Sequence, residues 1–182
     1  MKAGLLMSFE TIQSELLFEG RVFTLRSDQV RLPDGQVTRL DIVVHGGAVV
    51  LVPVDAEGNI WFVRQYRHAA AVTLVELPAG TLEPGEDIEE CAQRELREEI
   101  GMSAASFQKI GTFYLAPGYS TELLHIFLAQ DLSPDPLPGD VDEFLSVEKI
   151  AVAEVYTMAS EGAIQDAKTL ASLLLAQVHL LQ

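Results

Sequence analysis

The chain has 182 residues, with 12 Lys and Arg against 27 Asp and Glu, and therefore a formal net charge of −15 at pH 7. A surface this acidic repels nucleic acid and anionic lipid, so we expect neither a nucleic-acid nor a membrane partner. The single cysteine, Cys91, excludes an intramolecular disulfide, and no apolar stretch reaches the roughly 18 residues of a membrane span. The opening MKAGLLM is too short an apolar run for a signal peptide, and we expect a soluble, cytoplasmic protein.

The first half of the chain predicts strands. Residues 17–42 alternate apolar and polar side chains around the turn Pro33-Asp34-Gly35, which indicates an antiparallel β-meander. The continuous apolar run from Ala48 to Val54 is typical of a strand buried on both faces. A polar hairpin loop and a returning strand, residues 60–67, follow it. We expect residues 1–42 to form an N-terminal meander and residues 43–182 a separate domain.

The second half mixes helices with further strands. The pattern predicts a helix from Asp87 to Ile100, ended by Gly101. Beyond it we expect two strands, at 107–114 and 122–129, joined by the loop LAPGYS. A Pro/Asp-rich loop at 131–140 and a strand at 144–150 follow. The chain should then form helices at about 151–160 and 166–180, with Asp166 capping the second of these. Strands with helices appended and interspersed indicate an α/β or α+β sandwich.

The predicted helix at 87–100 contains a cluster of candidate metal-binding glutamates. Glu95, Glu98 and Glu99 stand at i, i+3 and i+4, so their carboxylates converge on one face of the helix. Clustered carboxylates suit Mg²⁺ or Mn²⁺ and not zinc or copper. Cys91, Leu96 and their neighbours form an apolar stripe that we expect on the opposite face, against a sheet. A solvated acidic helix face is the alternative. The glycine-bounded loop before the helix, which can bring backbone carbonyls close to a ligand, favours a site.

Residues 80–102, GTLEPGEDIEECAQRELREEIGM, resemble the Nudix box, G-x5-E-x7-R-E-U-x-E-E-x-G-U with U a bulky apolar residue, at every defined position. The matching residues are Gly80, Glu86, Arg94, Glu95, Leu96, Glu98, Glu99, Gly101 and Met102. The resemblance extends, more loosely, from about residue 18 to residue 178. It implies a Nudix fold, in which a mixed β-sheet lies between helices and the box forms a loop–helix–loop.

The resemblance also implies roles for the box residues. Members of this family use box glutamates to hold divalent cations on a substrate diphosphate. By position, the metal ligands would be Glu95, Glu98 and Glu99, together with the backbone carbonyl of Ala79. Glu86 and Arg94 would form a supporting ion pair, while Gly80 and Gly101 would shape the loops at the two ends.

Several short strings resemble the ADP-ribose pyrophosphatase branch of the family. They are VRQYRH (63–68), VELPAG (75–80), PGYSTE (117–122) and DAKT (166–169). Pro117, in the third string, lies 15 residues past Met102, where this branch carries a proline. This implies Mg²⁺-dependent hydrolysis of ADP-ribose or a related nucleoside diphosphate sugar to AMP and ribose 5-phosphate. GDP-mannose or another nucleotide sugar is the alternative substrate. A non-catalytic nucleotide-sensing module is the alternative class, disfavoured because the chain keeps every box glutamate.

Residues outside the box complete the expected site. The same resemblance implies that Glu143, in a loop after the box, would be the general base, with Asp142 and Glu99 as alternatives. Arg64 and Arg67 lie three apart on one strand and face opposite sides, and Arg67 is the favoured phosphate contact because arginine binds phosphate in a bidentate manner. Glu76 could pair with an arginine or contact a ribose hydroxyl.

Aromatic and loop residues are expected to form the rest of the pocket. Pro117 and Tyr119 would line it, and Phe18 would stack on the base, although packing is an alternative role for both aromatic residues. The resemblance further implies that the meander builds a homodimer interface.

Overall fold

The computed structural model describes residues 8–139 and 144–181, and the chain divides into two compact units. Unit 1 comprises Met1–Gly46 and Ala116–Glu122, and unit 2 comprises Gly47–Leu115 and Leu123–Gln182. Of the described helices, none combines the length and the apolar character needed to cross a bilayer.

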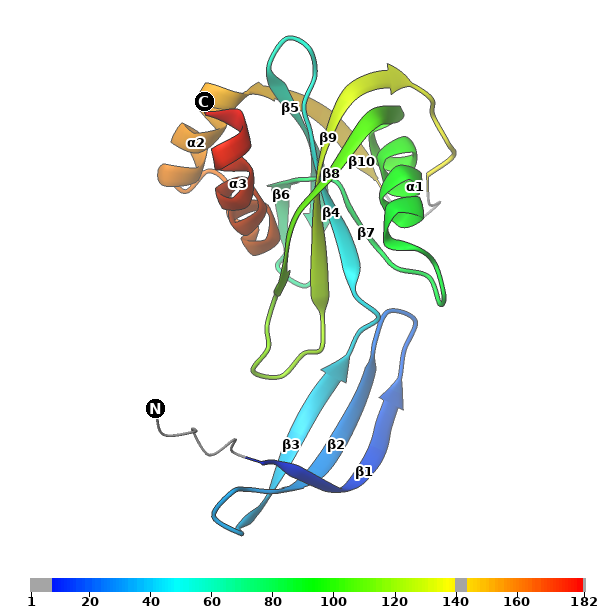
Figure 1. Cartoon of the computed structure of the whole chain (residues 1–182), viewed down its shortest axis with the longest axis vertical. Helices are drawn as coiled ribbons and strands as arrows, with labels where there is room; N and C mark the ends of the chain where they lie inside the picture. Colours follow the sequence, from blue (N-terminus) through cyan, green and yellow to red (C-terminus); the bar gives the residue numbers. More distant parts are fainter. Residues whose placement is uncertain (1–7, 140–143, 182) are drawn as a thin grey trace, which may run out of the picture. The chain divides into compact units, whose positions relative to one another are not determined.

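Unit 1 contains the predicted antiparallel meander, with strand order β1-β2-β3 (Figure 1). The strands are β1 (Glu10–Glu19), β2 (Thr24–Arg31) and β3 (Val37–Val44). β1 begins at Glu10, well before residue 17, where the sequence pattern predicted that the meander starts. Two register shifts in the pairing of β1 with β2 interrupt the alternation of apolar and polar residues that predicts a strand. Gly35, with φ 87°, allows the predicted turn between β2 and β3. The loop 116–122 joins this unit through a hydrogen bond from Val43 N to the carbonyl of Tyr119, at 2.8 Å.

Unit 2 holds two sheets, with strand orders β7-β4-β9-β8 and β10-β5-β6. Their strands are β4 (Ala48–Pro53), β5 (Asn59–Arg67), β6 (Val72–Glu76), β7 (Ala79–Thr81), β8 (Met102–Tyr114), β9 (Leu123–Pro134) and β10 (Leu145–Ala151). β4 pairs in parallel with β9 and antiparallel with β7, so the first sheet is mixed, as predicted.

Helices cover both faces of the central strands. α1 (Ile88–Ile100) lies on one side of the sheet, and α2 (Val152–Ser160) and α3 (Ala167–Leu180) lie on the other (Figure 1). Within β4, Val49 and Leu51 pack into the cluster beneath α1, whereas Val50 and Val52 pack into the cluster that includes α2 and α3. All four are fully buried, each stabilising the fold by about 1.5–3 kcal/mol, and the strand buried on both faces is confirmed.

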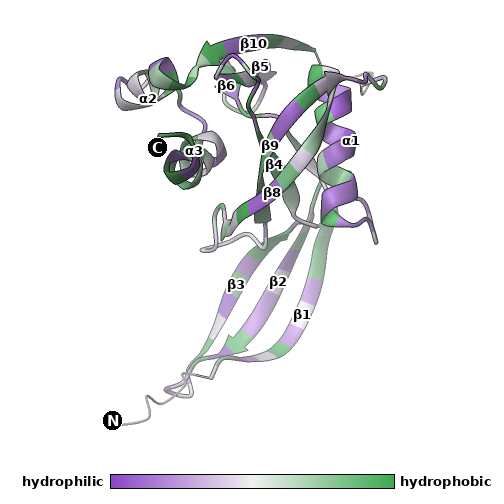
Figure 2. Cartoon of the chain, turned by 45° about the horizontal axis from the view of Figure 1, so that its top comes forward, coloured by the Kyte–Doolittle hydropathy of each residue, from purple (hydrophilic) through white to green (hydrophobic). Residues whose placement is uncertain are grey.

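The predicted elements differ from the structure mainly at their ends. β8 and β9 pair along their whole length, from Met102 opposite Pro134 to Tyr114 opposite Leu123, so the loop predicted for 131–140 starts too early. The short strands β6 and β7 were not predicted, since a strand of three to five residues is too short to display a period. The hydropathy colouring shows the outward side of α1 as mainly hydrophilic (Figure 2).

Candidate active site

Local sequence explains why α1 forms where it does. The Asp87 carboxylate caps the helix by accepting hydrogen bonds from the backbone N–H groups of Glu89 and Glu90, at 2.8 and 3.4 Å. Gly101 ends it in the left-handed conformation, with φ 70°, and its N–H bonds to the carbonyl of Leu96. The helix therefore has a fixed start and stop, which hold the glutamates between them in register with the sheet.

Two of the box glutamates lie on the buried side of α1. Glu95 and Glu99 are each only 8% exposed. They continue the row of the buried Cys91 at i+4 spacing, so the helix does not separate an acidic face from an apolar face as the sequence pattern predicted. Both carboxylates face the segment around β7 and not open solvent, as the following contacts show.

β7 is shaped around these two carboxylates. A Cβ atom on Gly80 would lie 1.8 Å from both Cδ and Oε1 of Glu95, so only glycine fits at this position unless Glu95 moves. The backbone N–H of Ala79 donates a hydrogen bond to Oε2 of Glu99, at 3.0 Å. The Ala79–Gly80 backbone thus fixes one carboxylate by a hydrogen bond and the other by close packing.

Arg94 is the central cation of the box. Its guanidinium donates to both oxygens of Glu86, at 2.9 and 3.0 Å, and also to Glu95 Oε1 at 2.6 Å and Glu98 Oε2 at 3.1 Å. The hydrogen bonds from Arg94 lower the pKa of Glu86 to about 2, and the same bonds raise the pKa of Arg94. Burial raises the pKa of the Cys91 thiol to about 12, so it supplies no thiolate.

The donor atoms of the box fit a divalent cation. Glu86, Glu95 and Glu98 share the guanidinium of Arg94, and Glu99 accepts from the Ala79 backbone, so carboxylates outnumber cations in these contacts. Carboxylate oxygens are the ligands that Mg²⁺ and Mn²⁺ prefer. Over residues 8–139 and 144–181, no three His, Cys, Asp or Glu side chains already stand in a metal-holding arrangement, and Arg94 bonds to two of the candidate ligands.

A second cluster forms at the end of β6. Glu76 is 1% exposed and accepts a bidentate pair of hydrogen bonds from Arg67, at 2.8 and 2.7 Å, and a further bond from Lys168. Burial alone would raise the pKa of Glu76, but the hydrogen bonds from Arg67 and the charge of Lys168 more than offset it and lower the pKa. Of the roles open to Glu76, the structure shows the pairing with an arginine.

In the part of the chain that the structure describes, the remaining predicted residues show no hydrogen bond or ion pair with these two clusters. Arg64 pairs with Glu148 of β10 at 2.6 Å and is not brought together with Arg67. Phe18, Pro117 and Tyr119 belong to unit 1, where Phe18 and Tyr119 are exposed. Glu143 and its alternative Asp142 fall outside the described residues, so the identity of the general base stays a prediction.

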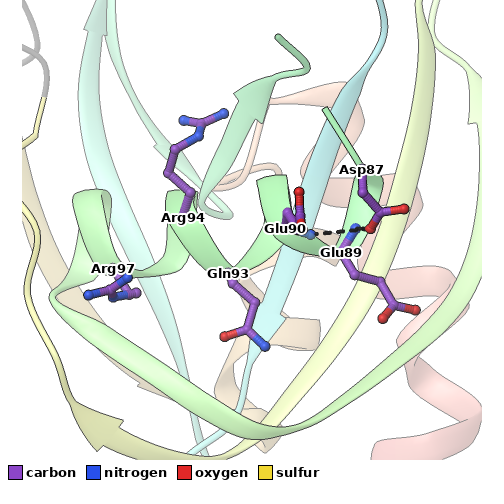
Figure 3. A pocket seen from close by; sticks show the side chains of 6 residues that line it. All are labelled: Asp87, Glu89, Glu90, Gln93, Arg94 and Arg97. Atoms are coloured by element: carbon purple, nitrogen blue, oxygen red, sulfur yellow. Dashed lines mark hydrogen bonds between the residues drawn. The ribbon is translucent and has the colours of Figure 1, made fainter. Parts of the chain in front are cut away.

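A surface pocket on α1 shares Arg94 with the box but none of the glutamates at its defined positions. Its lining comes entirely from the helix and its cap, namely Asp87, Glu89, Glu90, Gln93, Arg94 and Arg97. Figure 3 shows these side chains fanning out from the helix, with Arg94 pointing away from Gln93 and Glu89. Glu95, Glu98 and Glu99 are not among them, so this pocket is not the site that the box geometry describes.

Sequence reasoning did not identify Lys168 as a partner of Glu76 in the second cluster. It lies 92 residues from Glu76 and no local spacing links the two. The only available signal was the DAKT string, which was interpreted as a helix start.

Known proteins place the chain in a family. Residues 44–173 match the model described as the NUDIX domain, and residues 9–39 match the nucleoside diphosphate sugar hydrolase N-terminal domain. The chain is 40% identical over 162 residues to an ADP-ribose pyrophosphatase of Bacillus subtilis (strain 168), covering 88% of each chain. It is 31% identical over 187 residues to a GDP-mannose pyrophosphatase of Yersinia enterocolitica, covering 95% of this chain and 97% of the relative.

A solved structure agrees with these sequence relatives. The crystal structure of an ADP compounds hydrolase superposes with a TM-score of 0.86 at 25% identity, over 97% of this chain and 96% of that one. The mixed sheet between helices, the complete box and these matches lead to one conclusion: the chain belongs to the Nudix hydrolase family.

Proposed function

We propose that this protein hydrolyses the diphosphate of ADP-ribose, or of a closely related nucleoside diphosphate sugar, and that it uses Mg²⁺. The products from ADP-ribose are AMP and ribose 5-phosphate. The observation that supports this most strongly is the excess of box carboxylates over Arg94, held against the Ala79–Gly80 backbone. Nudix pyrophosphatases generally need a divalent metal ion, and Mn²⁺ suits the same oxygen donors.

The ligands in this proposal are Glu95, Glu98, Glu99 and the carbonyl of Ala79. A divalent cation held by these groups would offset the charge of the diphosphate oxygens and lower the pKa of the attacking water. Glu86 holds Arg94 through both carboxylate oxygens, and Arg94 in turn orients the carboxylates of Glu95 and Glu98.

The protein's other groups move the proton and bind the substrate. Glu143, or alternatively Asp142 or Glu99, would accept a proton from the attacking water. Arg67 would donate hydrogen bonds to a phosphate oxygen from the edge of its guanidinium that does not contact Glu76. Pro117, Tyr119 and Phe18 would contribute to recognition of the nucleoside.

Exposed apolar side chains of unit 1 support a homodimer as part of this proposal. Its large exposed apolar residues are Phe9, Ile12, Leu16, Leu17, Phe18, Val22, Phe23, Val37, Leu40 and Tyr119. A three-stranded sheet that leaves so many apolar side chains in water is typical of a surface that a partner covers. Light scattering or sedimentation that gives a monomer would rule the dimer out.

With one cysteine and no disulfide, the chain suits the cytoplasm.

Product analysis tests the reaction itself. Wild type incubated with ADP-ribose and Mg²⁺ should release AMP and ribose 5-phosphate, and both the Glu98→Gln variant and a metal-free reaction should lose the products. If the wild type binds nucleotides but does not turn over any nucleotide sugar, the hydrolase proposal fails and the sensing module replaces it.

GDP-mannose is the second candidate substrate, because the Yersinia relative named for that activity covers almost the whole chain. Comparing kcat/KM for ADP-ribose, GDP-mannose and other nucleotide sugars under the same conditions separates the two. A preference for GDP-mannose would change the substrate but leave the chemistry of the box intact.

A further inference from the structure

The first turn of α3 is fastened to the end of β6. Asp166 caps the helix by accepting from the N–H of Thr169 at 3.0 Å and from its hydroxyl at 2.6 Å. The same hydroxyl accepts from the backbone N–H of Leu77, at 2.9 Å, and Thr169 is fully buried. These bonds fix the helix start beside the segment that leads into Ala79 and Gly80.

Lys168 extends from this fixed turn to a buried carboxylate. Its ammonium group donates to Oε2 of Glu76 and, at 2.9 Å, to Asp166, and its side chain is 13% exposed. The Glu76 oxygen that it contacts also accepts from Nη2 of Arg67, at 2.7 Å. Glu76 is therefore held between two cations contributed by β5 and α3.

The pairing leaves one edge of Arg67 available. Arg67 uses Nε and Nη2 to bind Glu76, and a guanidinium has five N–H donors, so Nη1 points away from that carboxylate. The side chain is 42% exposed. The hydrogen bond to Glu76 raises the pKa of Arg67 against the effect of burial, and the charges of Asp166 and Glu99 add to this. Arg67 is bound to Glu76, which lies three residues before Ala79, and the N–H of Ala79 bonds to Glu99 of the box, so the guanidinium is held close to the box.

Lys168 also changes the net charge of the groups around Arg67. A lone Arg67–Glu76 pair would be neutral, and a neutral pair attracts a phosphate only weakly. With Lys168 and Asp166 included, two cations balance two carboxylates, whereas without Lys168 the other three groups would carry a net negative charge that repels a phosphate. Lys168 thus helps to fix Arg67 in place and removes the net negative charge that would oppose a phosphate.

We infer that Lys168 is a positioning residue for the substrate diphosphate: by holding Glu76 and sharing its charge, it keeps the free edge of Arg67 directed towards a phosphate beside the box. This inference rests on the proposed function. Lys168 itself does not contact the substrate.

Steady-state kinetics with ADP-ribose and Mg²⁺ test the inference. Lys168→Met should raise KM about tenfold, the usual effect of losing one charge-assisted hydrogen bond, and change kcat less than about threefold. Lys168→Arg, which keeps the cation, should recover KM to within about threefold. In an Arg67→Met background, Lys168→Met should add less than about twofold, because the residue it positions is gone.

Two controls separate positioning from folding. Lys109→Met removes an exposed lysine of β8 and should leave kcat and KM unchanged. If Lys168→Met does not fold, Lys168→Gln keeps hydrogen-bonding capacity without the charge and should show the same rise in KM. Thermal midpoints of all variants are recorded beside the kinetics.

The outcomes are distinct for the two proposals. An unchanged KM in Lys168→Met or Lys168→Gln, or a rise in KM that persists in full in the Arg67→Met background, overturns the positioning role while the hydrolase stands. A wild type that turns over no nucleotide sugar overturns the proposed function and this inference with it.

Discussion

Two charged clusters in unit 2 use the same kinds of side chain and balance their charges differently. The box cluster (Glu86, Arg94, Glu95, Glu98 and Glu99) sets four carboxylates against one guanidinium. The strand-end cluster (Arg67, Glu76, Asp166 and Lys168) sets two carboxylates against two cations. Carboxylates close together on one helix turn repel one another, and their number in the first cluster supports the proposed cation site. The balance in the second suits a cluster that holds an arginine still.

The two clusters also differ in how deeply their carboxylates are buried. Glu76, the centre of the balanced cluster, is almost completely buried, whereas Glu98 in the box cluster keeps part of its side chain in solvent. A fully buried carboxylate tolerates little rearrangement, because each of its hydrogen bonds replaces lost hydration. Among the proposed metal ligands, Glu98 keeps the most access to solvent, whereas Glu95 and Glu99 are buried.

The largest effect is expected from Glu98→Gln in the box cluster. The amide is a weaker ligand and lacks the charge, so kcat for ADP-ribose at saturating Mg²⁺ should fall by about two to three orders of magnitude. The thermal midpoint without metal should not fall, because removing one carboxylate relieves repulsion within the cluster. Glu90→Gln, on the exposed face of the same helix (Figure 3), serves as the matched control. Equal activity of the two variants would contradict the assignment of the box cluster as the metal site.

Gly80→Ala tests the geometry of the same cluster without changing its charge. The new Cβ atom would collide with the Glu95 carboxylate and displace it, so we expect kcat to fall about 10- to 100-fold, the result of misplacing a ligand by about an ångström. Thr81→Ala removes an exposed side chain from the same strand and should leave kcat unchanged. A fully active Gly80→Ala enzyme would show that the observed position of Glu95 is not needed for catalysis.

The box cluster could be predicted from sequence to the extent that its determinants are local. Asp87 and Gly101 define the helix ends, and fixed spacing places three glutamates within one turn. Their burial was not predictable, since it arises where β7, a strand too short to display a period, meets the helix. The pattern therefore predicted that these glutamates come together on one turn, but not the side of the helix on which Glu95 and Glu99 lie.

The strand-end cluster was less accessible to sequence analysis. Arg67 and Glu76 are close enough in the chain for their pairing to be considered, but Lys168 reaches Glu76 across 92 residues. Such a contact depends on the packing of α3 against the sheet, and no periodicity encodes it. Glu143 was predicted by resemblance alone and still awaits a direct test.

Thr169→Val tests the anchoring of the strand-end cluster. Valine fills the same space but leaves the buried N–H of Leu77 without its acceptor, so unfolding free energy should decrease by about 1–3 kcal/mol. Urea denaturation at pH 7 measures this, and Thr157→Val, at an exposed position of α2, provides the control. If the inference about Lys168 holds, KM should also rise, because the turn that carries the lysine loosens. A stable variant with wild-type KM would show that the cluster does not need this anchor.

The smallest effect is expected from the pH dependence of the Glu86–Arg94 pair. The hydrogen bonds from Arg94 hold the pKa of Glu86 at about 2, below its ordinary value of 4.5. A lowered pKa means that the pair stabilises the fold fully above about pH 4.5 and that this contribution is lost as the pH falls towards 2. In Glu86→Gln the contribution is absent at every pH, so the stability difference from wild type should be largest near neutrality and shrink below pH 4.5. Urea denaturation at pH 7, 4 and 3 measures the difference. A difference that stays constant over this range would mean that Glu86 contributes through packing and not through its charge, and Arg94 would then have to be held by Glu95 and Glu98.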